Sequence, residues 1–261
     1  NDVYYVIKDN RNYPHILCDI PEGNGDPGLT LFGEKVTPNH HALAREFVLL
    51  DNFYVNGEVS ADGHNWTMGG YATDFLEKNW PTSYGNRGGT YPGEGAREVA
   101  NNKVFFWDMC KQKGVSYRTY GEFVSDGKPT LAVLQDNYCR DFTGWDESVR
   151  DTVRFYQWKR DFDSLLAINA VPRFNTVRFI NDHTQGLSLG RPTPFAHVAD
   201  NDLALGMFVD YLSHSPIWNE TLIISVEDDA QNGPDHVDAH RSVALLAGGF
   251  VKQGFVDHTP Y

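Results

Sequence analysis

Polar side chains that could support metal chemistry gather in one late segment, where Asp228 and Asp229 follow the apolar run TLIISV. His236 and His240 come soon after, at a four-residue spacing that would let both imidazoles face one way on a helical turn. Adjacent carboxylates repel each other unless a cation lies between them. The segment therefore indicates a metal site, and a solvated acidic loop with two incidental histidines is the alternative.

Two further polar pairs come shortly after apolar runs. Asp9 and Asn10 follow YYVIK, and Asp182 and His183 follow TVRFI. Each pair also has an ordinary interpretation, because Asp-His pairs are common in surface loops and Asx residues often end strands by forming turns.

Ser60 is the candidate nucleophile, in the segment GEVSADGHNW. The alternative role is a helix N-cap, since a helix-like segment follows it. The two roles are compatible, because the first residues of a helix present N–H groups and a positive dipole end to an anion such as phosphate. His64 lies four residues further on and could face the same way.

The elements that must position these residues alternate along the chain. Near-continuous apolar runs predict buried strands of a parallel sheet that is covered on both faces, and helix-like stretches separate them, the last with Asp200, Asn201 or Asp202 as its cap. The alternation predicts an α/β fold whose ligands bind beyond the carboxyl ends of the strands. The predicted strands are 3–7, 45–54, 116–120, 176–180 and 221–226, and the predicted helices are 94–113, 148–169 and 199–214.

Composition narrows the class of protein. The chain has 261 residues and a formal net charge of −13, which argues against a nucleic-acid-binding surface and suits a protein that holds cations. Its three cysteines are scattered, which excludes a thiolate zinc knuckle. The sequence has no apolar run long enough for a transmembrane segment and no signal peptide. No linker divides it, so we expect one domain over 1–261, the core of a longer protein.

Taken in order, these motifs resemble the alkaline phosphatase superfamily, and more closely the bacterial phosphoesterase family that includes phospholipases C and acid phosphatases. The matching stretches are VIKDNRNYPHILCD, VNGEVSADGHNW, NDHTQG and EDDAQNGPDHVDAHRS. The resemblance implies a three-layer α/β/α fold with a mostly parallel central sheet. It also implies a periplasmic or secreted location.

The resemblance implies roles for single residues. Asp9 matches the acidic ligand after the first strand, where this branch usually has Glu-Asn-Arg, and Asn10 would face the phosphoryl group. Ser60 matches the nucleophile, which also binds the metal. Asp228 and Asp229 match the paired ligands after the late strand.

A second set of ligands follows from the same resemblance. Asp182 matches the acidic ligand of another metal, His183 is the nearest imidazole, and His240 matches the final histidine ligand. His236 would be a second-shell residue or an alternative ligand. The implied cofactor is one or two divalent ions; zinc suits these ligands, and manganese or calcium remain open.

The leading hypothesis is a metal-dependent hydrolase of phosphoric monoesters or diesters that acts through a phosphorylated Ser60, with Asn10 and His64 as further catalytic candidates. Phospholipase C-like activity, phosphotransfer and a metal-binding surface module without catalysis are the alternatives. A sulfatase is disfavoured, because Ser60-Ala61-Asp62-Gly63-His64 lacks the arginine of the sulfatase motif. The substrate stays open, as does whether the aromatic residues that follow Ser60 line a pocket or pack in the core; they are Trp66, Tyr71, Phe75, Trp80, Tyr84 and Tyr91.

Overall fold

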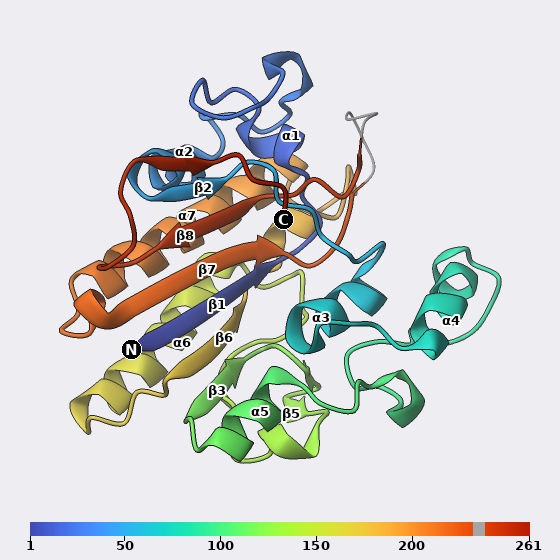
Figure 1. Ribbon diagram of the computed structural model, residues 1–261. Coiled ribbons are helices and arrows are strands. Elements are labelled where there is room, and N and C mark those ends of the chain that lie inside the picture. Colours follow the sequence, from blue (N-terminus) through green and yellow to red (C-terminus); the bar gives the residue numbers. More distant parts are fainter. Residues whose placement is uncertain (232–237) are drawn as a thin grey trace.

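A mostly parallel sheet runs through the centre of the computed structural model, which describes residues 1–231 and 238–261 (Figure 1). Within those residues the sheet has seven strands in the order β3-β6-β1-β7-β8-β2-β9. β8 is antiparallel to both of its neighbours, and the other pairings are parallel. The strands are β1 (Asp2–Lys8), β2 (Val48–Leu50), β3 (Tyr117–Tyr120), β6 (Phe174–Arg178), β7 (Thr221–Glu227), β8 (Ala244–Ala247) and β9 (Phe255–Asp257); β4 (Val124–Ser125) and β5 (Lys128–Pro129) form a separate hairpin.

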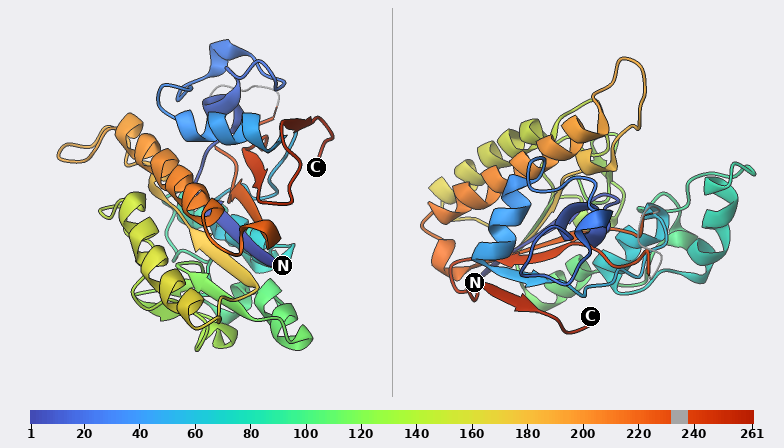
Figure 2. Two further views of the ribbon diagram at one scale, coloured as in Figure 1. Left: turned by 90° about the vertical axis from the view of Figure 1, so that its left-hand side faces the viewer. Right: turned by 90° about the horizontal axis from the view of Figure 1, so that it is seen from above.

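Helices cover both faces of the sheet, and Figure 2 shows α6 and α7 side by side on one of them. α3 and α5 lie on the other face, and α4 projects beyond α3 (Figure 1). The α-helices are α1 (Tyr13–Leu17), α2 (Pro38–Glu46), α3 (Ser60–Gly69), α4 (Asp74–Tyr84), α5 (Phe106–Lys113), α6 (Asp151–Ala167) and α7 (Pro194–Ser213).

The central strand β1 shows why the sheet needs both layers. Its side chains alternate between two apolar cores, with Tyr4 and Val6 in the cluster that α6 and α7 complete. Ile7 belongs to the cluster on the opposite face, which Met68 of α3 joins, and Tyr5 packs against it. A strand that is apolar on both faces is stable only when both are covered, and the predicted three-layer α/β/α architecture is confirmed.

The predicted strands 3–7, 116–120 and 221–226 are confirmed, and so is the helix at 148–169. The strand predicted at 176–180 is confirmed, but it begins and ends two residues earlier, at Phe174–Arg178. The strand predicted over 45–54 is wrong in extent, because α2 continues to Glu46 and only Val48–Leu50 pair in the sheet. The helix predicted over 94–113 begins only at Phe106.

The caps predicted for the helix at 199–214 are wrong for that helix. α7 begins five residues earlier, where the Thr193 side chain accepts a hydrogen bond from the Ala196 N–H. Asp200 instead accepts from the backbone N–H of Asp151 at 2.7 Å and so caps α6. Asp202 accepts from the N–H of His40 at 2.8 Å, in the first turn of α2. These carboxylates therefore tie three helices together.

Within the described ranges, no helix has the length and apolar character needed to cross a membrane. The single domain over 1–261 stays a prediction.

Candidate active site

Two neighbouring parallel strands deliver acidic residues to one edge of the sheet. Lys8 of β1 lies in register with Glu227 of β7, so Asp9 and Asp228 follow at adjacent strand ends. The Asp228 N–H donates to the Lys8 carbonyl at 3.1 Å and keeps the two chains paired one residue beyond the strands. Parallel pairing thus brings together residues that are more than two hundred positions apart in the sequence.

Helix α3 reaches this edge because glycine lets it approach the backbone after β7. A Cβ atom on Gly63 would lie 2.3 Å from the carbonyl oxygen of Asp228, which is far inside van der Waals contact. The start of the helix is fixed by Asp62, whose carboxylate accepts from the Val59 N–H at 3.0 Å. Ser60 therefore enters the site as the first residue of the helix.

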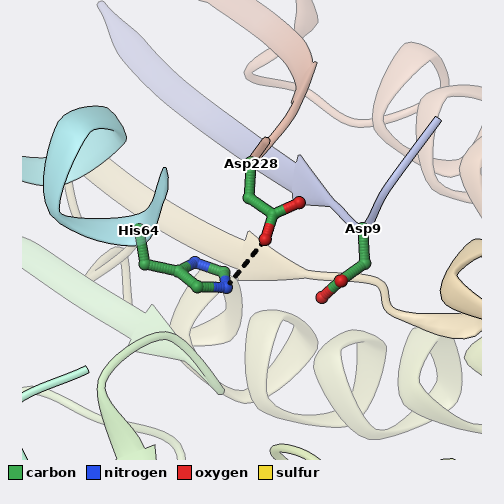
Figure 3. Close-up of side chains that lie close together, drawn as sticks. All are labelled: Asp9, His64 and Asp228. Carbon is green, nitrogen blue, oxygen red and sulfur yellow. Dashed lines mark ion pairs between the residues drawn. The ribbon is translucent and has the colours of Figure 1, made fainter. Parts of the chain in front are cut away.

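Asp9, His64 and Asp228 converge from three elements, as Figure 3 shows. One ligand atom from each lies within 4.8 Å of the others, and all three side chains are buried. His64 Nε2 is 3.3 Å from Asp228 Oδ2. Two carboxylates and an imidazole at this separation form a candidate metal centre.

The other nitrogen of His64 is held by a carboxylate. Nδ1 lies 2.7 Å from Oε1 of Glu122, which is fully buried. This is the carboxylate–histidine arrangement that directs Nε2 toward a metal. Burial and the charge of Arg178 lower the pKa of His64, but Glu122 and Glu94 outweigh both effects and leave it at about 9.

A neighbouring contact decides the protonation of His64. Nη2 of Arg178 lies 2.8 Å from Nε2 of His64, and a guanidinium can only donate. The contact therefore requires the neutral form of His64, even against a pKa of about 9, because two N–H donors cannot share that distance. Neutral imidazole is also the form that binds metals, and a cation bound at Nε2 would take the place of the Arg178 N–H on that lone pair.

Ser60 and Asn10 are tied to the second of the paired aspartates. Ser60 Oγ donates to Asp229 Oδ2 at 3.0 Å. With its amide nitrogen facing the carboxylates, Asn10 donates to Asp229 Oδ1 at 2.7 Å and to Asp9 Oδ1 at 3.0 Å. Asn10 adopts a φ of 65°, a left-handed conformation that asparagine tolerates better than most residues and that often marks functional sites.

The site holds more negative charge than its protein neighbours balance. Burial first, and then the nearby carboxylates, raise the pKa of Asp9 and of Asp228 to about 7. Burial and the Asp228 charge raise the pKa of Asp229 well above its ordinary value. Asp228 Oδ2 is buried and has no hydrogen-bond partner among the described residues. These donors fit a divalent cation, which would supply the missing positive charge.

Asp182 is close but directed elsewhere. Its Oδ1 accepts from the Asp9 N–H at 3.1 Å and from the Asn201 amide at 3.2 Å. Its Oδ2 lies 3.4 Å from Nζ of Lys8, a buried lysine that also pairs with Glu227. Asp182 thereby fixes the backbone of Asp9.

The histidines predicted for a second metal are spread out. His183 Nδ1 contacts Glu147 at 2.9 Å, and His240 Nε2 contacts Glu58 at 3.2 Å. His236 lies outside the described residues. In the part of the chain that the structure describes, the one group of three potential ligands within reach of each other is Asp9, His64 and Asp228. Ligation by Asp182, His183, His236 or His240 stays a prediction.

Sequence reasoning missed Arg178, Glu94 and Glu122. Arg178 is buried, lies 3.5 Å from Asp9 Oδ2, and pairs with Glu94 through two contacts of 2.6 and 3.1 Å. The available signal was a single arginine inside the apolar run TVRFI. Nothing comparable in the sequence marks Glu94 or Glu122.

A pocket of about 560 Å³ opens beside Ser60. Its wall includes Tyr84, Tyr91 and Trp145, and Asn10 and Arg178 line it where it meets the carboxylates. The arrangement places an apolar cavity directly against a serine hydroxyl and a candidate metal centre.

The fold is that of the alkaline phosphatase superfamily. A protein of that superfamily from Vibrio parahaemolyticus superposes with a TM-score of 0.64 at 17% identity, covering 98% of this chain and 62% of its own. The lipoteichoic acid synthase LtaP from Listeria monocytogenes superposes with a TM-score of 0.58 at 13% identity, and the match covers 98% of this chain and 67% of LtaP. Murine ectonucleotide pyrophosphatase/phosphodiesterase 5 superposes with a TM-score of 0.52 at 13% identity, and the match covers 87% of this chain and 57% of the murine protein.

The sequence assigns the chain to one family. Residues 20–261 match the Phosphoesterase family, and the chain belongs to that family. No curated protein sequence matches it. The chain spans less than two thirds of the length of the Vibrio and murine proteins.

Proposed function

We propose that the chain is a metal-dependent hydrolase of phosphoric esters in which Ser60 is the nucleophile. The observation that carries the proposal is the position of Ser60 Oγ. It lies at the first turn of α3, 3.0 Å from Asp229 Oδ2 and next to the buried group of Asp9, His64 and Asp228. A divalent cation held by that group, for which zinc is the first candidate, would act as a Lewis acid toward the phosphoryl oxygens.

The residues of the chain have separable roles in this mechanism. Asp229 Oδ2 orients the Ser60 hydroxyl and is the atom placed to take its proton. Ser60 is the first residue of α3, and the positive end of the helix dipole there favours the negative charge of the phosphoryl group. Asn10 holds Asp9 and Asp229 in place through its amide. Attack by Ser60 releases the alcohol, and hydrolysis of the phosphoserine restores the hydroxyl.

The test is hydrolysis of p-nitrophenyl phosphate and of bis(p-nitrophenyl) phosphate by the purified protein. Each ester is assayed before chelation, after chelation, and after addition of zinc, manganese or calcium. We expect turnover that is lost on chelation and restored by one of these metals. The ratio of the two rates separates monoesterase from diesterase activity.

The nucleophile is tested with Ser60→Ala, which should reduce kcat by at least about a thousandfold. Ser213→Ala is the matched control, because Ser213 ends α7 and its hydroxyl bonds only the Asp210 carbonyl and His214 among the contacts of the described chain. Acid-quenched wild-type enzyme should carry phosphate on Ser60 by mass spectrometry. Near-normal turnover in Ser60→Ala would remove Ser60 from the mechanism.

A further inference from the structure

The pocket beside Ser60 has a wall of exposed aromatic rings. Tyr84 is 42% exposed, Tyr91 37% and Trp145 46%, although all three line one cavity of about 560 Å³. Water does not favour such a concentration of apolar surface, so a pocket of this kind usually marks a ligand site.

The charged groups of the pocket are already paired. Among the described residues that line it, Arg178 is the one arginine or lysine. Both of its terminal nitrogens contact Glu94, at 2.6 and 3.1 Å, and its guanidinium lies 5.2 Å from the centre of the Trp145 ring. The described lining of the cavity therefore offers no free positive charge for a second phosphate, and its occupant should be uncharged.

The wall is also built to be rigid. Glu94 has a φ of 53°, strained for a non-glycine residue, and lies between Gly93 and Gly95. A Cβ atom on Gly93 would lie 2.4 Å from the Ala61 carbonyl, so this loop packs directly on the residue that follows Ser60. His183 meets the Trp145 ring edge-on at 5.0 Å and holds its orientation. A rigid wall of flat rings is better matched to a flat ligand than to a flexible chain.

We propose that this pocket binds a planar, uncharged aromatic group of the substrate, so that the natural ester joins phosphate to an alcohol with an aromatic ring. This assignment rests on the proposed function, because it takes the phosphoryl group to lie at Ser60. The aromatic group is the part of the substrate that the carboxylate edge does not contact.

The test measures binding without turnover, by titration calorimetry of the metal-loaded protein with three non-hydrolysable phosphonates. These are 2-phenylethylphosphonate, hexylphosphonate and ethylphosphonate, which share one anionic group. Ring stacking should make the phenylethyl compound bind about threefold to tenfold tighter than the hexyl compound, and the ethyl compound should bind weakest. Equal or tighter binding of hexylphosphonate would overturn the proposal and favour an aliphatic, lipid-like occupant.

Two variants locate the preference. Tyr84→Ala should reduce the phenylethyl-to-hexyl affinity ratio toward one, because Tyr84 supplies one of the wall's rings. Tyr156→Ala is the matched control, since Tyr156 is 52% exposed on α6 and does not line the pocket; it should leave the ratio unchanged. An unchanged ratio in Tyr84→Ala, with the protein folded by circular dichroism, would also contradict the proposal.

Hydrolysis of 2-phenylethyl phosphate and hexyl phosphate, whose leaving groups are both alkoxides, separates the two claims. If the phosphonates bind in the expected order but no ester is cleaved, the proposed function fails and the pocket assignment stands. If both esters are cleaved and the phosphonates show no aromatic preference, the pocket assignment fails and the proposed function stands.

Discussion

The candidate site has two sides that balance charge in opposite ways. The strand-end side consists of Asp9, Asp228 and Asp229, three buried carboxylates whose pKa values are raised because burial and mutual repulsion disfavour their charged forms. On the pocket side, Arg178 and Glu94 pair closely, and the charge and hydrogen bonds of Arg178 lower the pKa of Glu94 to about 2 against the opposing effect of burial.

The difference indicates what each side lacks. Among the described residues, the carboxylates of the strand-end side have few positive partners, which favours a bound cation there. The pocket side has its charges satisfied and exposes aromatic rings, so it needs an uncharged apolar ligand. A phosphate ester of an aromatic alcohol, bound together with a divalent cation, would meet both needs.

The largest expected effect is that of Asp228→Asn on the strand-end side. Losing a carboxylate from the metal group should reduce kcat/KM by about a thousandfold, since a bound cation supplies several kcal/mol of transition-state stabilisation. The melting temperature of the chelated variant should nevertheless rise, because one repelling charge is gone. Differential scanning calorimetry with and without EDTA measures the second effect.

Asp210→Asn is the control for that variant, because Asp210 is 76% exposed on α7 and is not part of the candidate metal centre. It should alter neither activity nor melting temperature. A chelated Asp228→Asn protein that melts well below wild type would show that the carboxylates are balanced within the chain.

The same isosteric change on the pocket side should have the opposite sign. Glu94→Gln leaves the buried guanidinium of Arg178 without its closest carboxylate, which should destabilise the protein by about 3 kcal/mol. Urea unfolding of the chelated protein measures this, with exposed Glu98→Gln as the control. An unchanged unfolding free energy would mean that Asp9 alone suffices to balance Arg178.

How far the sequence predicts the site differs between these two sides. Asp9, Asp228 and Ser60 were identifiable because each ends or follows an apolar run, and parallel strands must present their ends at one edge. Glu94 and Tyr91 lie in an irregular segment whose position depends on long-range contacts, such as the approach of Gly93 to Ala61. No local periodicity encodes such a contact.

The same distinction between local and long-range information explains which strands and helix caps were predicted correctly. β1 and β7 are long and apolar, so composition alone identifies them. Asp200 and Asp202 were correctly identified as capping residues but assigned to the wrong helix, since they cap α6 and α2 across the interface. The type of a residue indicates which groups it can bind, but only the packed structure shows which partner it contacts.

The pH dependence of stability should also separate the two sides. In the chelated protein the pKa of Asp9 and of Asp228 is about 7, against an ordinary value of 3.8. Carboxyl groups with raised pKa values contribute stability that is complete below pH 4 and lost as the pH rises through 7, on the order of a few kcal/mol. Glu94 acts in the opposite direction: its stabilisation is present above pH 4.5 and lost as the pH falls toward 2.

Urea titrations from pH 3 to 8 should therefore show a stability maximum near pH 4 to 5 without metal. Added metal should remove the decline toward pH 8, because it binds the deprotonated carboxylates. Glu94→Gln should abolish only the loss of stability on the acid side of the maximum, where the pH falls toward 2. A chelated protein that gains stability steadily up to pH 8 would contradict the excess of charge on the strand-end side.

The smallest expected effect concerns the residue behind His64. Glu122→Gln keeps the size of the side chain but removes the charge that accepts from His64 Nδ1 at 2.7 Å. Such a partner makes the imidazole a stronger ligand, so metal affinity should fall about tenfold to a hundredfold, with little change in fold. Competition between the protein and a fluorescent zinc chelator measures this directly.

Glu147→Gln is the matched control, because Glu147 contacts Nδ1 of His183 at 2.9 Å in the same manner. If His64 is the ligand, Glu147→Gln should change metal affinity by less than about twofold, because Glu147 supports the imidazole of His183, which the metal then does not contact. A loss of affinity in Glu147→Gln with none in Glu122→Gln would transfer the ligand role to His183. The two variants thus decide which histidine completes the carboxylate site, because each removes the same chemical support from one candidate only.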